Sequence, residues 1–178
     1  LIDKLVDLSK SLKVGPGYEK DSELTPLISQ NQLEKVEGYA RSGVQAGAEA
    51  VVGGNRCDRK GHFFESTVLN NVKQDMTVAR EEIFGPVLSI IDYEEPEEAI
   101  KIANDTDYGL AAGIFTKDLD QATKASNQLE AGQIYINSWF TGSIATPFGG
   151  YKQSGYSREK GQQALKSYLQ VKNIGIQL

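Results

Sequence analysis

Strand-like and helix-like segments alternate in the second half of the sequence, and this alternation constrains the fold more than any other feature. Apolar runs of strand-forming residues occupy 87–91, 110–115 and 133–136. Helix patterns lie between them, at about 96–104 and 118–130. Strands joined by helices at this spacing run parallel in one sheet, and the nearly continuous apolar character of the strands predicts helices on both faces. The sequence therefore predicts an α/β fold built on a parallel sheet.

The first half of the sequence predicts two helices and two strands. An apolar repeat with helical spacing predicts a helix that ends near Lys13. Ser29 and Gln32 match a capping box, in which a serine begins a helix three residues before a glutamine. The helix that follows is expected to bury one apolar stripe, formed by Leu33, Val36, Ala40 and Val44. Short strands are expected at 50–52 and 63–69.

The last residues form a separate segment. After a helix expected around 159–166, residues 168–178 mix strand-forming and polar residues, and no helix follows to cover them. An exposed edge of this kind tends to pair with another chain. We therefore expect a main domain over residues 1–167 and an extended oligomerisation strand over residues 168–178.

Composition and charge exclude several classes of partner. The net charge is −5 and Lys and Arg form no basic patch, so no nucleic-acid partner is expected. Apolar stretches fall short of the roughly 18 residues that span a bilayer, so no membrane partner is expected. The single cysteine suits a reducing compartment and predicts a cytoplasmic protein. The helix pattern begins at Leu1 without an N-cap residue, which favours a piece of a longer polypeptide.

The segment REEIFGPV at residues 80–87 carries the strongest signal for a site. Two adjacent carboxylates, Glu81 and Glu82, precede a Gly-Pro turn and a strand, and α/β proteins place ligand contacts at the ends of strands. Gly85 permits a positive φ or a close approach to a ligand, and Pro86 fixes the entry into the strand. The alternative is a pair of solvated glutamates on an ordinary turn.

Other patterns that suggest chemistry have simpler explanations. Cys57 and His62 are the only cysteine and the only histidine, and a thiol beside an imidazole can form a nucleophile with its base. They lie in a polar loop without a positioned electropositive pocket, so we interpret both as ordinary loop residues. Gly149, Gly150 and Lys152 fit neither glycine-rich phosphate-binding pattern, and tight turning explains them better. Residues with metal-ligand spacing are absent, so no metal site is expected.

Three segments, in this order, resemble motifs of the aldehyde dehydrogenase superfamily. They are EEIFGPV at 81–87, NDTDYGLAAGIFTKD at 104–118 and PFGGYKQSGYSREKG at 147–161. The resemblance covers the whole chain but only the C-terminal, catalytic-domain portion of the family's polypeptide. It implies an enzyme that oxidises a small aldehyde to a carboxylic acid with NAD or NADP as cofactor. It also implies a homo-oligomer assembled through the C-terminal strand.

The resemblance further implies roles for five residues. Glu82 matches the glutamate that hydrogen-bonds the ribose of the nicotinamide nucleotide, and Phe84 matches the phenylalanine beside the nicotinamide. Phe148 matches a position that contacts the aldehyde, whereas Trp139 and Phe140 fall in a variable loop at the mouth of the substrate tunnel. The family's nucleophilic cysteine, general base and dinucleotide-binding domain precede the matched portion. No catalytic residue is therefore expected in this chain, and the chain alone is expected to be inactive.

Two other functions stay open from the sequence. One is a non-catalytic α/β module that only binds or oligomerises. The other is an acylating aldehyde dehydrogenase, which passes the acyl group to coenzyme A instead of water. The fold alone separates neither from the hydrolytic enzyme.

Overall fold

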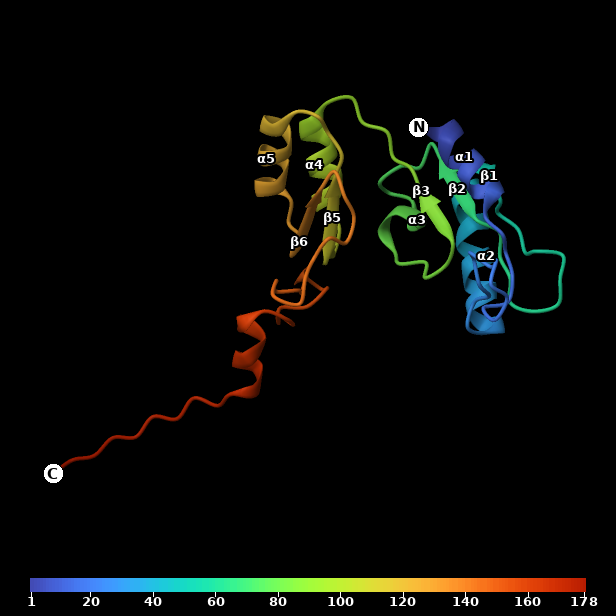
Figure 1. Ribbon diagram of the computed structural model, residues 1–178. Coiled ribbons are helices and arrows are strands. Elements are labelled where there is room, and N and C mark those ends of the chain that lie inside the picture. Colours follow the sequence, from blue (N-terminus) through green and yellow to red (C-terminus); the bar gives the residue numbers. More distant parts are fainter. The chain divides into compact units, whose positions relative to one another are not determined.

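The computed structural model describes residues 1–178 and divides into two compact units, Leu1–Tyr93 and Glu94–Leu178. Each unit contains both helices and strands (Figure 1), which confirms the α/β class. None of the helices combines the length and the apolar character that a membrane crossing requires.

A three-stranded sheet forms the centre of the first unit. Its strands are β1 (Glu49–Val52), β2 (Thr67–Asn70) and β3 (Val87–Ser89), in the order β1-β2-β3. The β2 and β3 strands pair in parallel, whereas β1 runs antiparallel to β2. The sequence predicts a longer strand at 63–69, but Phe64 makes only an isolated bridge, to Arg56.

Two helices cover opposite faces of this sheet. Leu69 of β2 faces α2 (Gln30–Gln45), because a Cβ atom on Gly43 of that helix would lie 3.1 Å from Leu69 Cδ1. Its neighbour Val68 lines a shallow hollow together with Leu8 of α1 (Ile2–Ser11). Successive side chains of a strand point to opposite faces, so α1 and α2 lie on different sides of β2.

The start of α2 follows the predicted pattern, and its buried stripe differs at one position. The Ser29 hydroxyl accepts a hydrogen bond from the Gln32 backbone N–H at 3.2 Å, which confirms the N-cap. Gly43 is buried in place of Val44, which is 47% exposed. A glycine at position 43 lets the helix approach β2 closely, and the next residue, Val44, faces solvent. The core of the unit consists of ten buried residues, Leu33, Val36, Ala40, Ala48, Phe64, Leu69, Val72, Met76, Val78 and Ile83.

The second unit contains a parallel β-α-β arrangement. The strands β5 (Ala111–Ile114) and β6 (Gln133–Ile136) pair in parallel, and α5 (Leu119–Gln128) connects them. The Asp118 carboxylate caps α5 by accepting a hydrogen bond from Gln121 N, as predicted. The helix α4 (Pro96–Asn104) has the bounds that its sequence pattern predicts. The sequence places 87–91 in one sheet with these strands, but β3 finds its partner in β2 of the first unit.

The remaining elements of the second unit are short. The strands β4 (Tyr108–Gly109) and β7 (Tyr151–Lys152) form an antiparallel pair. A 3-10 helix, η1 (Gln162–Tyr168), replaces the helix expected around 159–166. The reason is that Glu159 exchanges two backbone hydrogen bonds with Phe148, each of 2.7 Å, and so is held in an extended conformation.

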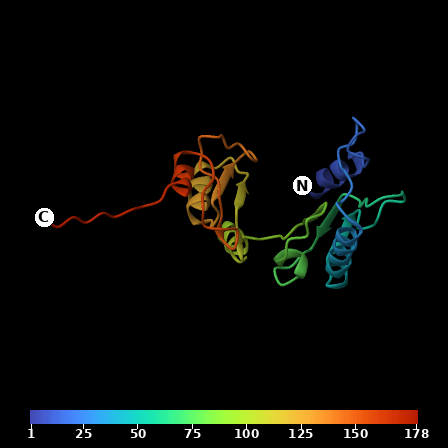
Figure 2. The same ribbon diagram turned by 90° about the horizontal axis from the view of Figure 1, so that it is seen from below.

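Residues 169–178 form neither helix nor strand within this chain. Both views show the segment extending away from η1 without folding back (Figure 1, Figure 2). Four of its apolar side chains are largely exposed, namely Val171, Ile174, Ile176 and Leu178. The role of residues 168–178 as an oligomerisation strand stays a prediction.

An ion pair fastens the loop after β1 to α2 and makes a prediction about pH. Two N–H groups of Arg56 donate to one carboxylate oxygen of Glu37, at 3.1 and 2.6 Å. The hydrogen bond from Arg56 is the main reason that the pKa of Glu37 lies below its ordinary value. A lowered pKa in the folded state stabilises the protein above the unfolded pKa, and this stabilisation is lost as the pH falls through the folded pKa.

We expect Glu37→Gln to reduce the free energy of unfolding by roughly 0.5–1 kcal/mol at neutral pH, because the pair is partly exposed. The difference from wild type should disappear on acidification. Urea unfolding followed by circular dichroism at several pH values measures both effects. Glu49→Gln, an exposed carboxylate on β1, is the matched control. A deficit that is the same at acidic and neutral pH would contradict the electrostatic origin.

Candidate functional site

The turn at residues 81–86 presents a carboxylate and an aromatic ring to solvent. Glu82 is exposed, and the Phe84 side chain is 72% exposed. Phe84 has a φ of 52°, in the left-handed region that a residue with a side chain rarely occupies. A non-glycine residue in this conformation costs of order 1 kcal/mol or more, so the surrounding structure must hold it there. Strain of this kind is concentrated at functional positions in proteins.

Gly85 has a different role from the one that the sequence suggests. It is not among the residues with positive φ, and the close approach that it permits is to a helix. A Cβ atom at position 85 would lie 2.5 Å from Cγ2 and 2.7 Å from Cγ1 of Val36, a fully buried residue of α2. Glycine is therefore required so that the turn can pack against α2.

Gln32 holds the backbone of the turn. Its side-chain amide donates hydrogen bonds to the carbonyl oxygens of Ile83 and Phe84, both at 3.0 Å. The sequence pattern predicts Gln32 only as part of the helix cap and does not reveal this second contact, which joins residues more than 50 positions apart. A glutamine at the third position of a capped helix was the available signal, since its side chain projects from the helix end.

The two glutamates have different surroundings. The hydroxyl of Tyr39 donates a hydrogen bond of 2.6 Å to the carboxylate of Glu81, which ties Glu81 to α2. Glu82 is the carboxylate that the turn presents outward, next to Phe84. An exposed carboxylate can accept hydrogen bonds from two neighbouring hydroxyl groups of a ligand, and the charge strengthens both.

The three aromatic residues selected from the sequence form one cluster with a fourth. In the second unit the rings of Trp139 and Phe140 lie 5.6 and 6.0 Å from the ring of Tyr135. Phe148 lies 6.0 Å from Phe140, and the ammonium group of Lys160 lies 5.3 Å from the Phe148 ring. Tyr135 is buried. Because it lies within a predicted strand, the sequence does not distinguish it from an ordinary core residue.

This aromatic cluster covers one face of the β5–β6 pair. Ile136 lines a hollow with Leu119 and Ala122 of α5, so α5 packs on the Ile136 side. Tyr135 is the preceding residue of the same strand and points to the opposite face. Trp139 and Phe140 are 59% and 57% exposed, so the cluster offers aromatic faces to a ligand.

The loop that carries the cluster begins at a rigid point. Asn137, the residue after β6, has a φ of 53°. Its side-chain amide accepts a hydrogen bond from Thr116 N at 2.9 Å and donates one to Thr116 O at 2.8 Å. These two bonds tie the end of β6 to the end of β5, and the C-terminal ends of parallel strands are where α/β proteins bind ligands.

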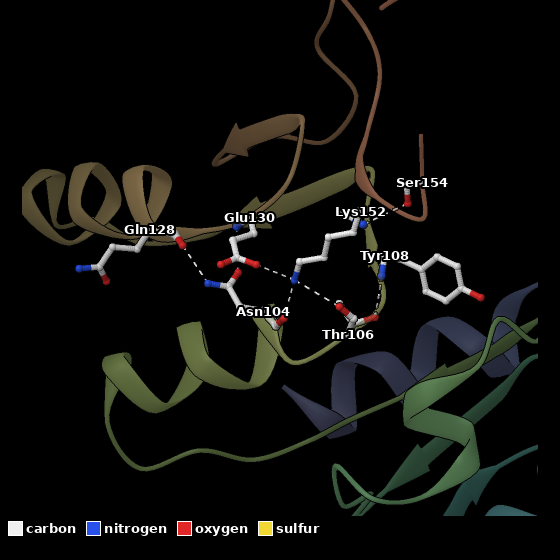
Figure 3. Close-up of polar contacts among 8 residues, drawn as sticks. Asn104, Thr106, Tyr108, Gln128, Glu130, Lys152 and Ser154 are labelled. Carbon is white, nitrogen blue, oxygen red and sulfur yellow. Dashed lines mark hydrogen bonds and ion pairs between the residues drawn. The ribbon is translucent and has the colours of Figure 1, made fainter. Parts of the chain in front are cut away.

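Lys152 is occupied by contacts within the chain and not by a phosphate-binding arrangement. Its ammonium group donates to the carbonyl oxygens of Asn104 and Thr106 at 2.6 and 3.2 Å and pairs with Glu130 at 2.7 Å (Figure 3). Gly149 lies where a Cβ atom would meet the carbonyl oxygen of Ser157 at 2.2 Å. Lys152 therefore fastens β7 to residues 104–106 and to Glu130, and glycine at position 149 permits the close approach of the Ser157 backbone.

The geometry of Cys57 gives no sign of an activated thiol. Burial is the main cause that raises the pKa of Cys57 above its ordinary value, and the nearby charge of Glu65 acts in the same direction. A raised pKa disfavours the thiolate, which is the nucleophilic form. The backbone carbonyl of His62 accepts a hydrogen bond from Leu27 N at 2.8 Å, which ties this loop to residue 27.

A family model and individual relatives both match this sequence. The model of the aldehyde dehydrogenase family matches residues 1–174. The chain is 47% identical over 176 residues to aldehyde dehydrogenase family 2 member B4, mitochondrial, of Arabidopsis thaliana. It is 45% identical over 176 residues to a mitochondrial benzaldehyde dehydrogenase of Antirrhinum majus. These alignments cover 97% of this chain and 33% of each relative, so the chain spans about a third of their length.

A solved structure agrees with the sequence comparison. The aldehyde dehydrogenase from Bacillus cereus in its NAD+ complex superposes with a TM-score of 0.92 at 43% identity, over 96% of this chain and 35% of that chain. The family model spans nearly the whole sequence and the fold matches a solved relative. The chain belongs to the aldehyde dehydrogenase family.

Proposed function

We propose that this chain is the C-terminal, catalytic-domain portion of an NAD(P)-dependent aldehyde dehydrogenase that oxidises an aldehyde to a carboxylic acid. In this reaction the aldehyde carbon loses a hydride to the nicotinamide and gains the oxygen of a water molecule. Residues 1–167 are part of the catalytic domain, and residues 168–178 are the oligomerisation strand. Family membership and the span of about a third of the relatives' length support the proposal. The cytoplasmic location stays a prediction, because both relatives named above are mitochondrial.

The turn at 81–86 is the observation that carries the cofactor assignment. We assign Glu82 to the hydroxyl groups of the nicotinamide ribose and Phe84 to the side of the nicotinamide ring. The exposure of both side chains and the two hydrogen bonds from Gln32 fit such a contact. When bound, NAD(P)+ accepts the hydride from the aldehyde. A rigid turn matters for this chemistry because hydride transfer is sensitive to distance and angle.

The aromatic cluster supports the assignment of the aldehyde site. We assign Phe148, Trp139 and Phe140 to the walls of the substrate pocket. Pockets for small molecules are lined mainly by apolar and aromatic side chains. The half-exposed faces of Trp139 and Phe140 can exclude water from an apolar substituent of the aldehyde.

Glu82→Gln in the enzyme that contains this chain tests the cofactor assignment. The substitution keeps the size of the side chain but removes its charge, and one lost charge-assisted hydrogen bond is worth roughly 1.5–3 kcal/mol. We therefore expect NAD(P)+ affinity or turnover to fall by about ten- to a hundredfold. Steady-state kinetics with varied cofactor concentration measures the loss.

Glu81→Gln is the matched control, because glutamine can still accept the hydrogen bond from Tyr39. It should change the kinetics much less than Glu82→Gln. Equal losses from the two substitutions would remove the basis for assigning the ribose contact to Glu82.

The chain by itself should not oxidise aldehydes. Its only thiol, Cys57, has a raised pKa and a loop environment, so it provides no activated nucleophile. Purified chain incubated with NAD+ and a panel of aldehydes should give no NADH above a matched blank. Activity that survives repurification and is lost in Cys57→Ser would show that the nucleophile lies within this chain.

The same assay on the enzyme that contains this chain separates hydrolysis from acyl transfer. Carboxylic acid formed without added coenzyme A supports the proposed reaction. An absolute requirement for coenzyme A would support the acylating alternative. No turnover of any aldehyde would favour a non-catalytic module.

Residues 169–178, which follow η1, provide the proposed contact with another chain. Its side chains Val171, Ile174 and Ile176 are 74% exposed or more, and apolar groups with strand propensity gain stability when another sheet buries them. Deleting residues 169–178 should shift the molecular mass in solution toward the monomer. Multi-angle light scattering over a range of concentrations measures the shift. A wild-type chain that is already monomeric at high concentration would contradict the assignment.

A further inference from the structure

The benzene part of the Trp139 indole ring lies close to Gly113, an exposed residue of β5. A Cβ atom at position 113 would lie 3.1 Å from Cε3 and 3.2 Å from Cζ3 of Trp139. Carbon atoms in ordinary contact are about 3.5–4.0 Å apart. The indole ring therefore occupies space that is free only because residue 113 has no side chain.

The backbone does not require glycine at this position. Gly113 is absent from the residues with positive φ, unlike Gly53, Gly155 and Gly161. It also lies inside a regular parallel pairing, opposite Tyr135. Glycine in the interior of a strand is unfavourable by roughly 0.5–1 kcal/mol relative to alanine. Its benefit at position 113 is therefore the space that it leaves for the indole ring.

This space determines where one wall of the aromatic cluster lies. Gly113 and Tyr135 are paired residues of adjacent strands, so they share a face of the sheet. Trp139 lies over Gly113 and meets the Tyr135 ring at an interplanar angle of 62°. A Cβ atom at position 113 would shift the indole ring by a few tenths of an ångström, and a larger side chain would push it further from the sheet and would also contact Phe115, whose Cε2 lies 3.5 Å from that Cβ position. Trp139 is 59% exposed, so the ring is able to move outward into solvent.

We propose that Gly113 is a specificity-determining position, which sets the width of the aldehyde pocket by letting Trp139 lie against the β5 backbone. The inference rests on the proposed function, since it takes Trp139 as a pocket wall. Gly113 itself acts as a positioning residue, through the indole ring. With the ring seated on β5, the pocket accepts bulky or aromatic aldehydes. The aldehyde is assigned to the exposed side of the ring, so a ring displaced outward takes up part of the pocket and favours short aliphatic aldehydes.

The first experiment follows the ring directly in the 178-residue chain. Trp139 is the only tryptophan, so selectively excited fluorescence reports on this ring alone. Quenching by acrylamide should increase in the order wild type, Gly113→Ala, Gly113→Val, as the side chain at position 113 grows. Both variants place better strand formers in β5, so they should fold. Gly38→Ala, at a glycine with nothing within 4 Å of its Cβ position, should leave the quenching unchanged.

The second experiment measures substrate ranking in the enzyme that contains this chain. Gly113→Val should lower kcat/KM for benzaldehyde relative to acetaldehyde by about tenfold, the scale of discrimination by one or two methylene groups in a pocket. The KM for NAD+ should not change. In a Trp139→Ala background, adding Gly113→Val should alter the ranking by less than about twofold, because the group that it displaces is gone.

The outcomes separate this inference from the proposed function. A wild-type enzyme that turns over no aldehyde would overturn the proposed function. An active enzyme whose benzaldehyde-to-acetaldehyde ranking is unaffected by Gly113→Val would overturn only the role of Gly113. Unchanged acrylamide quenching in both variants would show that the indole ring is not seated on Gly113. A ranking change that persists in the Trp139→Ala background would show that residue 113 acts without the indole ring.

Discussion

The contact between helix α2 and the turn at 81–86 is the constraint on which the candidate cofactor site depends. Gly85 packs on Val36 at a distance that excludes any side chain, and Gln32 donates to two carbonyl oxygens of the turn. Two such hydrogen bonds contribute about 1 kcal/mol each, which offsets a cost of similar size for the left-handed conformation of Phe84. The strained residue is therefore stable, and its ring points outward beside Glu82.

In the second unit a glycine also permits a close contact, here between a strand and an aromatic ring. A missing side chain at Gly113 lets the Trp139 ring lie on the backbone of β5, just as Gly85 lets a backbone lie on Val36. Asn137 ties the end of β6 to Thr116, and Lys152 ties β7 to the carbonyl oxygens of Asn104 and Thr106. The aromatic rings form the exposed surface of the cluster. Gly113, the Asn137 amide and the Lys152 ammonium group fix the backbone of the second unit around it.

Local signals in the sequence predict most helices and strands of this chain. Where the structure differs from these predictions, the cause is a contact between residues far apart in the sequence. The caps at Ser29 and Asp118 depend on residues three positions away, and both are confirmed. The partner of β3 and the second contact of Gln32 depend on residues far along the chain, and no periodicity reveals them. Glu82 and Phe84 were selected by resemblance to a family, whereas the reason why Phe84 is held outward became visible only in the fold.

A crystal structure of the enzyme that contains this chain, with NAD+ bound, would show whether Glu82 contacts the nicotinamide ribose. We predict that the carboxylate of Glu82 accepts hydrogen bonds from the hydroxyl groups of the nicotinamide ribose, with oxygen–oxygen distances of about 2.5–3.0 Å. Phe84 should retain its positive φ and lie beside the nicotinamide ring. A complex in which other residues hold the ribose while Glu82 stays in solvent would contradict the account.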